Sequence, residues 1–280
     1  MSRSRGPEVH WRACGRGPGL VLLNGWSASG LAWPRSWLRE LEREFRVVRI
    51  DNRGSGWSRF VPTPFTMADL ADDVAAVLDA AELPSATVLG MSMGGMIAQE
   101  FAMRHGDRLD ALVLVATRAP APAYIVPRTS GEALGLLTPP RRGEALDTYF
   151  TRVWSTAVGD GFADRNADAI AELVRQIVER PTPRQMLVHQ LRAVNGWGHA
   201  ERLRGVIAPT AIVHGTQDRL MDVRNARRLA ELIPQARLVE LTGVGHLPPL
   251  EAPDAVLEVI ADVAGAAANG STPTLETSSG

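Results

Sequence analysis

Short apolar runs alternate with longer amphipathic stretches along most of the chain. Six of these runs have the length of buried strands and end at Gly, Pro or polar residues. The expected strands are Leu20–Leu23, Arg46–Ile50, Ala86–Gly90, Ala111–Ala116, Thr210–His214 and Arg237–Leu241. Because helical patterns separate most of them, the sequence predicts an α/β fold with a mostly parallel central sheet and helices on both faces.

Five helices and one further strand complete the expected core. The helices are Pro34–Glu44, Met67–Glu82, Met93–Met103, Val223–Leu232 and Pro253–Ala264. Thr66 and Asp69 have nearly the pattern of a capping box at the start of the second helix. We expect Val9–Ala13 to form a hairpin with Leu20–Leu23 through the Gly-rich turn between them.

The alternation of strands and helices is interrupted between Ala119 and Gly205. Prolines cluster at the start of this segment, and another follows its end. Inside it, apolar residues at helical spacing predict helices over Glu144–Val158, Ala167–Glu179 and Arg184–Val194. We therefore expect residues 119–205 to form a helical lid inserted into a core made of residues 8–118 and 206–264.

The two ends of the chain have low apolar content. Residues 265–280 are mostly Ala, Gly, Ser and Thr, which bury too little surface to offset the entropy of ordering, so we expect a disordered tail. The first residues, Met1 to Gly19, lack the apolar stretch of a secretory signal. No apolar run reaches the ~18 residues of a transmembrane span, and no membrane association is expected.

The composition is that of a globular protein, and it narrows the possible chemistry. A net charge of −1 favours neither nucleic acid nor an anionic membrane as a partner. Every basic residue is arginine, and the lack of lysine excludes a Schiff-base lysine, a pyridoxal-phosphate anchor and a P-loop lysine. Cys14 is the only cysteine, so no intrachain disulfide can form, and we expect a cytoplasmic protein.

A serine stands between an expected strand and an expected helix. Residues Gly90 to Gly94 read G-M-S-M-G, the G-x-S-x-G pattern of a nucleophile elbow. At such an elbow the serine has a strained backbone on a sharp turn, and a side chain two residues to either side would clash. The pattern alone is weak evidence, but the strand before it and the helix after it supply the required context. We predict that Ser92 is a nucleophile.

One histidine has the position of a general base. His246 lies in a Gly-flanked loop after the last expected strand and before the last helix, at the edge of the sheet where ligands of open α/β sheets bind. His214 ends a strand, and its neighbours favour packing there. The other four show no ligand spacing: His10, His105, His189 and His199.

The expected acid follows the strand Thr210–His214. Asp218 at this place gives the chain order serine, acid, histidine. Asp222 is the competing residue, but its position favours capping of the next helix. An acid after Ala111–Ala116 is the other topological possibility, and the residues that follow that strand include no carboxylate.

Two Gly-rich stretches resemble nucleotide-binding loops without meeting their requirements. Asp51–Ser58 follows a strand, but it lacks the Gly-Lys-Ser/Thr ending and leads to no immediate helix. We interpret it as a structural turn braced by Asp51 and Arg53. The glycines from Gly15 to Gly19 precede a strand instead of a helix, so they do not form a dinucleotide fingerprint.

Four motifs together resemble the α/β-hydrolase superfamily over about residues 8–264. They are G-M-S-M-G-G from Gly90, D-N-R-G-S-G-W-S from Asp51, H-G-T-Q-D from His214, and Gly245-His246 followed by Glu251-Ala252-Pro253. Within the superfamily the chain resembles the capped group of esterases, lactonases and C–C hydrolases, including 3-oxoadipate enol-lactonases. The resemblance implies a triad of Ser92, Asp218 and His246 with no metal or organic cofactor.

The loop after the first core strand departs from a common family pattern. Many relatives carry His-Gly where this chain has Asn24-Gly25, a variation that enol-lactonase-like sequences tolerate. The resemblance implies that the backbone N–H of Trp26 pairs with that of Met93 as an oxyanion hole. We interpret Asn24 as a residue that only shapes the turn.

The implied function is that of a serine hydrolase cleaving a carboxylic ester or lactone through an acyl-enzyme intermediate. The alternatives on the same triad are a C–C bond hydrolase, a perhydrolase, an acyltransferase, an aminopeptidase and a small-molecule receptor that keeps the triad. Haloalkane dehalogenases and epoxide hydrolases are disfavoured because they carry an aspartate where Ser92 stands. Trp26, Trp154 and Trp197 are candidates to line an apolar substrate pocket, and core packing is an equal alternative for the last two.

Overall fold

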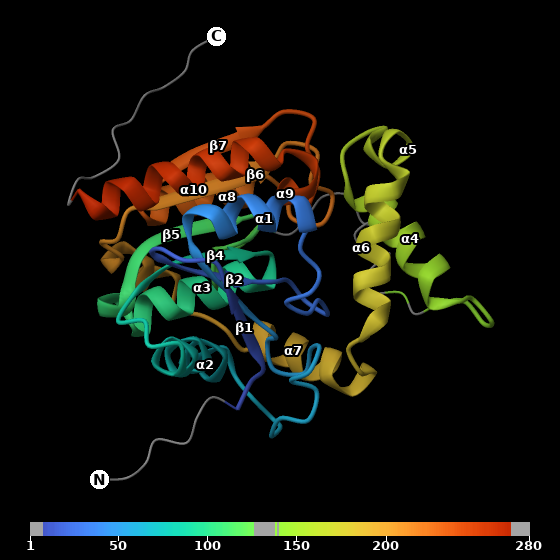
Figure 1. Ribbon diagram of the computed structural model, residues 1–280, viewed down its shortest axis with the longest axis horizontal. Helices are drawn as coiled ribbons and strands as arrows, with labels where there is room; N and C mark the ends of the chain where they lie inside the picture. Colours follow the sequence, from blue (N-terminus) through green and yellow to red (C-terminus); the bar gives the residue numbers. More distant parts are fainter. Residues whose placement is uncertain (1–7, 126–137, 139, 270–280) are drawn as a thin grey trace.

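The computed structural model describes residues 8–125, 138 and 140–269. Within them, seven strands form one sheet in the order β1-β3-β2-β4-β5-β6-β7, with β2 to β7 parallel (Figure 1). The strands are β1 (Trp11–Cys14), β2 (Gly19–Leu23), β3 (Arg46–Ile50), β4 (Ala86–Met91), β5 (Leu109–Val115), β6 (Thr210–Gly215) and β7 (Arg237–Leu241). The predicted mostly parallel α/β sheet is confirmed.

Helices cover both faces of the sheet. One face packs against α1 (Arg35–Glu44) and α10 (Pro253–Ala268), and the other packs against α2 (Met67–Ala80), α3 (Met93–Arg104) and α8 (Arg224–Leu232). Strands β2 and β4 are buried along their whole length because both of their faces are covered. This explains why they read as continuous apolar runs instead of alternating patterns.

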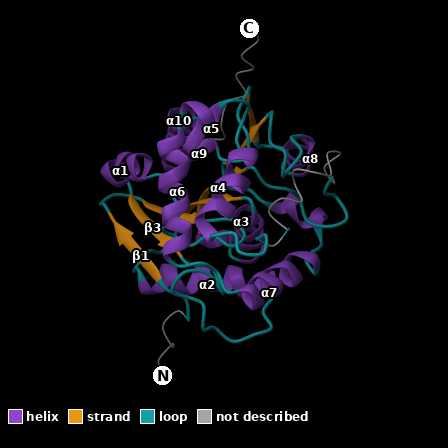
Figure 2. Ribbon diagram, turned by 90° about the vertical axis from the view of Figure 1, so that its right-hand side faces the viewer, coloured by secondary structure: helices purple, strands orange, loops and turns teal. Residues whose placement is uncertain are grey.

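The segment between β5 and β6 includes several helices among its described residues. It contains α4 (Leu146–Ala157), α5 (Phe162–Arg165), α6 (Ala167–Glu179) and α7 (Arg184–Asn195), followed by a short 3₁₀ turn at Ala200–Gly205. In Figure 1, α4, α5 and α6 stand as a group beside the sheet, and in Figure 2 they lie in front of it. A helix occurs at each place where the apolar spacing predicts one. None of the helices in the described part of the chain is long and apolar enough to cross a membrane.

Helix α2 begins at the predicted capping box. The hydroxyl of Thr66 accepts the N–H of Asp69 at 3.2 Å, and the carboxylate of Asp69 accepts the N–H of Thr66 at 2.7 Å. Two of the N–H groups that a helix start leaves without partners are therefore satisfied by local side chains, as the sequence predicts.

The predicted hairpin between the first two strands is wrong. β1 pairs antiparallel with β3, where Trp11 lies opposite Ile50, and β2 lies between β3 and β4. The backbone N–H of Arg46 donates to the carbonyl of Pro18, so the linking turn passes the start of β3. β2 takes a central place because it is entirely buried, whereas the largely exposed β1 suits a sheet edge.

The predicted disordered tail is wrong at its start. Residues 265–268 belong to α10, which continues to Ala268 and ends at Asn269. The extra turn is rich in alanine, the residue with the highest helix propensity, and it extends a helix already held on the sheet by Val259 and Val263. Residues 270–280 lie outside the described part of the chain.

Candidate active site

Ser92 lies on a strained turn between β4 and α3. Its backbone has φ 56° and ψ −118°, a conformation that costs a non-glycine residue about 1–3 kcal/mol. A Cβ atom at position 94 would lie 2.0 Å from the carbonyl oxygen of Leu23, so Gly94 permits the close approach of the turn to β2. The turn is held from the next strand, since Ser92 N–H donates to Val115 and the Thr117 hydroxyl donates to the Ser92 carbonyl at 2.7 Å.

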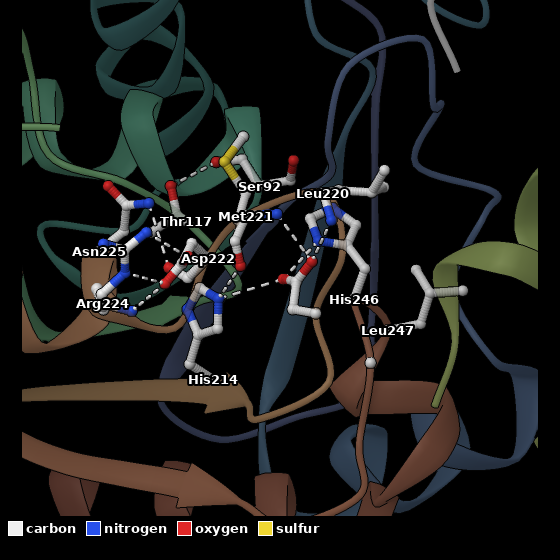
Figure 3. Close-up of polar contacts among 12 residues, drawn as sticks. Ser92, Thr117, His214, Leu220, Met221, Asp222, Arg224, Asn225, His246 and Leu247 are labelled. Carbon is white, nitrogen blue, oxygen red and sulfur yellow. Dashed lines mark hydrogen bonds and ion pairs between the residues drawn. The ribbon is translucent and has the colours of Figure 1, made fainter. Parts of the chain in front are cut away.

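His246 and Asp218 form a buried pair. The Nδ1 atom of His246 lies 2.8 Å from Oδ2 of Asp218, whose other oxygen accepts the backbone N–H groups of Leu220 and Met221 at 2.9 and 2.8 Å. In the view of Figure 3, Ser92 lies above the His246 ring. An imidazole oriented in this way by a carboxylate can take a proton from a hydroxyl group.

The Asp218 carboxyl is ionised despite its burial. Burial alone would raise its pKa, but the charge of His246 and hydrogen bonds from His214 and His246 hold that pKa well below its ordinary value. The acceptance of two backbone N–H groups by the same side chain agrees with an ionised carboxylate. Asp218 therefore presents a full negative charge to the histidine.

A second histidine contacts the same carboxylate oxygen. His214, on β6, places Nε2 at 3.2 Å from Oδ2 of Asp218 and at 2.8 Å from the carbonyl oxygen of Met221 (Figure 3). Burial acts to lower the pKa of His214, but the hydrogen bond and charge of Asp218 outweigh it and raise this pKa. Sequence reasoning missed this contact. The only signal for it was a histidine four residues before the expected acid.

Glu251 braces the loop that carries His246, a role that sequence reasoning did not assign. Its carboxylate accepts the backbone N–H groups of both neighbours of the histidine, Gly245 at 2.8 Å and Leu247 at 2.9 Å. The same side chain accepts the N–H of Gly159 at 2.7 Å, and His246 N–H donates to Ala157 at the end of α4. The loop that carries His246 is therefore hydrogen-bonded to the segment that follows α4.

The loop after β2 approaches Ser92 closely. A Cβ atom at Gly25 would lie 3.1 Å from that of Ser92. The Asn24 side chain accepts the Gly25 N–H at 2.8 Å and donates to the carbonyls of Ser29 and Ala32, so it shapes the turn as interpreted from the sequence. Within the described residues, the backbone N–H groups of Trp26 and Met93 make no hydrogen bond.

The three candidate tryptophans lie in different places. Trp26 lines a cavity of about 580 Å³, and its indole N–H donates to the Leu187 carbonyl on α7 at 3.1 Å. Trp154 is buried in the apolar cluster that contains α1 and α10. Trp197 donates to Glu100 at 3.0 Å and borders a separate cavity of about 240 Å³. The structure therefore does not bring the three side chains together.

The remaining candidate residues have structural contacts. Asp222 accepts the first N–H of α8 and pairs with Arg224, as expected for a helix-capping acid. In the Gly-rich turn, Asp51 accepts the N–H groups of Gly30 and Trp57, and Arg53 forms an ion pair with Asp73. No group of three or more metal-ligating side chains occurs in residues 8–125, 138 and 140–269.

Comparison with known proteins places this geometry in a family. A family model for the alpha/beta hydrolase fold matches residues 18–253. Poly(3-hydroxyalkanoate) depolymerase of Ectopseudomonas oleovorans is 30% identical over 242 residues, which cover 86% of this chain and 82% of that protein. Pimeloyl-(acyl-carrier protein) methyl ester esterase of Aeromonas hydrophila subsp. hydrophila is 29% identical over 255 residues, which cover 88% of this chain and 95% of that protein.

The solved structures give the same result. The crystal structure of the enol-lactonase from Burkholderia xenovorans LB400 matches with a TM-score of 0.75 at 26% identity, covering 91% of this chain and 95% of that one. The named relatives are hydrolases, and both the family match and the structural match extend over most of the chain. The chain is therefore a hydrolase of the α/β-hydrolase fold family.

Proposed function

We propose that the chain is a serine hydrolase that cleaves a carboxylic ester or lactone through an acyl-enzyme intermediate. One observation carries the proposal: the 2.8 Å hydrogen bond between His246 and the buried Asp218, combined with Ser92 on the strained turn after β4. The names of the relatives support the ester or lactone, because they include an esterase, a depolymerase and an enol-lactonase.

Each residue has a defined step in the proposed reaction. Nε2 of His246 takes the hydroxyl proton as Ser92 Oγ bonds to the carbonyl carbon, and the N–H groups of Trp26 and Met93 donate to the resulting oxyanion. Collapse of this intermediate breaks the bond to the alcohol oxygen, which takes the proton from His246. A water molecule, deprotonated by His246, then adds to the acyl carbon. Collapse of this second intermediate breaks the acyl-serine bond, and the Ser92 oxygen takes the proton back from His246.

In this proposal, the hydrogen bond between the Ser92 hydroxyl and His246 forms only when substrate is bound. No hydrogen bond joins the Ser92 hydroxyl to His246 within the described residues. In unliganded hydrolases such a contact is often long and tightens only with substrate bound. We therefore place the Ser92–His246 hydrogen bond in the substrate complex.

We propose that residues 119–205 act as a lid and that the substrate acyl group binds beneath it. The cavity beside Trp26 is bounded on one side by the loop after β2 and on the other by α4 and α7. Its walls include the apolar side chains of Tyr149, Phe150, Leu187 and Val188, which suit an apolar group. The cavity and the proposed oxyanion hole share Trp26, and we place the acyl group in the cavity on that ground.

A panel of 4-nitrophenyl esters and lactones tests this function. We expect repeated turnover on at least one ester, with kcat/KM rising from acetyl to hexanoyl because each added CH₂ buried in the cavity contributes about 0.8 kcal/mol, or roughly fourfold. The measurement is steady-state release of 4-nitrophenol with an active-site titration. A single incomplete cycle would favour a small-molecule receptor. Activity confined to substrates with a cleavable C–C bond would favour a C–C bond hydrolase.

Two substitutions at one position test the oxyanion hole. Trp26→Ala and Trp26→Pro both remove the indole and its bond to Leu187, but only proline also removes the backbone N–H. Loss of one oxyanion donor typically costs about 10²–10³-fold in kcat. We expect Trp26→Pro to be at least about tenfold slower than Trp26→Ala on every ester, with little difference in KM.

Thermal unfolding and stoichiometric phosphonate labelling of Ser92 serve as controls for both variants, because proline also restricts the loop. Equal kcat values in two folded, fully labelled variants would show that the N–H of Trp26 is not a donor.

A further inference from the structure

We propose that His214 is a positioning residue for the acid of the triad and donates Nε2–H to the carboxylate oxygen of Asp218 that also accepts from His246. The inference rests on the proposed function, because Asp218 has its orienting role only there. His214 touches none of the reacting atoms in this proposal. It acts through Asp218 on the base.

The surroundings of the ring determine where its hydrogen lies. Nε2 of His214 faces two acceptors, the Met221 carbonyl at 2.8 Å and Oδ2 of Asp218 at 3.2 Å. Neither oxygen carries a hydrogen, so Nε2 must be the protonated nitrogen whether the ring is neutral or charged. Nδ1 is buried and has no hydrogen-bond partner in the described part of the chain.

The donation from His214 completes the coordination of the carboxylate. Oδ1 accepts the N–H groups of Leu220 and Met221, and Oδ2 accepts from His246, while Nε2 of His214 lies 3.2 Å from Oδ2 and supplies the fourth donor in this proposal. A carboxylate with two donors on each oxygen cannot rotate without breaking several hydrogen bonds. His214 therefore holds Oδ2 in position opposite Nδ1 of His246.

Sharing of Oδ2 also weakens the effect of Asp218 on the base. Each donor stabilises part of the negative charge, so the carboxylate stabilises the His246 imidazolium less than it would with His246 as the only partner on Oδ2. Both His214 and Asp218 have fully buried side chains, where such interactions are poorly screened by water. His214 thus limits how strongly Asp218 can stabilise the charged form of the His246 ring.

The other charged groups near His214 are already paired. Asp222 pairs with Arg224, and Glu240, opposite His214 on β7, pairs with Arg227. Both carboxylates act on His214 only through their charge, whereas Asp218 also accepts its hydrogen. Asp218 is therefore the group through which a change at His214 reaches the base.

The test compares pH profiles of kcat/KM for 4-nitrophenyl butyrate in His214→Leu and His214→Gln. Leucine removes the donor, so the acid limb of the kcat/KM profile should move to higher pH. We expect a displacement of about 0.5–1 pH unit, because one hydrogen bond to a charged group has an effect somewhat larger than this. Glutamine keeps an N–H near the position of Nε2, so its limb should lie closer to wild type than to the leucine variant. A glutamine limb displaced as far as that of leucine, or an undisplaced leucine limb, would overturn the proposal.

A histidine on a carboxylate away from the site provides the matched control. Nε2 of His105, just after the end of α3, lies 2.7 Å from Oδ1 of Asp72. His105→Leu should leave the pH profile of kcat/KM unchanged. A shift of the same size in this variant would mean that the change at His214 acts through the overall charge or stability of the protein.

A spectroscopic measurement on the wild-type chain keeps the proposal testable if the leucine variant does not fold. Nitrogen-15 spectra of the histidine rings, assigned with His214→Gln, should show His214 protonated at Nε2, with this proton shifted downfield. A bare Nε2 on His214 would overturn the proposal. Phosphonate labelling of Ser92 reports separately on the proposed function, and its failure would leave the position of the His214 hydrogen measurable.

Discussion

Ser92→Ala is expected to lower kcat for short activated esters by roughly 10⁴-fold or more while the fold survives. The proposed reaction has no other nucleophile, since the acyl group is carried by the Ser92 oxygen. Alanine leaves the hydrogen bond between His246 and Asp218 intact, and the backbone of the turn keeps its contacts with Val115 and Thr117. The activity of this variant is therefore the blank for every substrate.

A serine-reactive phosphonate identifies the nucleophile independently of any substrate. We expect one added mass per chain in the wild type, located on Ser92 by peptide mapping, and no added mass in Ser92→Ala. Ser85→Ala, next to the other end of β4, is the matched control and should be labelled like the wild type. Activity near that of the wild type in Ser92→Ala, or a label elsewhere, would remove the basis of the proposed mechanism.

Asp218→Asn is expected to cost roughly 10²–10⁴-fold in kcat. An amide of the same shape lacks the negative charge that stabilises the His246 imidazolium. The amide also cannot accept all three hydrogen bonds that the carboxylate receives, so either His246 or the Leu220–Met221 backbone meets an N–H group. If His246 loses its acceptor, its ring is free to adopt the wrong tautomer.

Asp222→Asn is the matched comparison, because it lies four residues further along the same loop. Its contacts are with Arg224 and the start of α8, so we expect a loss of less than about tenfold. Both variants are measured by kcat on one ester, with thermal unfolding as the control for folding. A larger loss in Asp222→Asn would identify Asp222 as the acid.

Much of the candidate site could be identified from the sequence because its signals are local. The elbow requires particular residues within five positions, Gly90 to Gly94, where the backbone turn leaves no room for a side chain. Asp218 and His246 each follow an expected strand, and the carboxyl ends of parallel strands meet at one edge of a sheet. The topology therefore brings distant residues together without knowledge of any contact.

Other contacts could not be predicted because they join segments far apart in sequence. The choice among Trp26, Trp154 and Trp197 depends on how the helical segment packs on the core, as the bond from Trp26 to Leu187 illustrates. The role of Glu251 depends on the fold of the His246 loop, whose neighbouring N–H groups it accepts. Composition and periodicity contain no information about either contact.

By itself, the sequence determined the parallel sheet, the helices on both faces, the elbow at Ser92 and the candidates Asp218 and His246, since each follows from hydrophobic period or from a motif of a few residues. Only the tertiary structure decided that β1 pairs with β3, that α10 extends to Ala268, and that His214 shares Oδ2 of Asp218 with His246. These features depend on the close packing and hydrogen bonding of buried groups from segments that are distant in sequence. Such contacts are determined only in the folded chain.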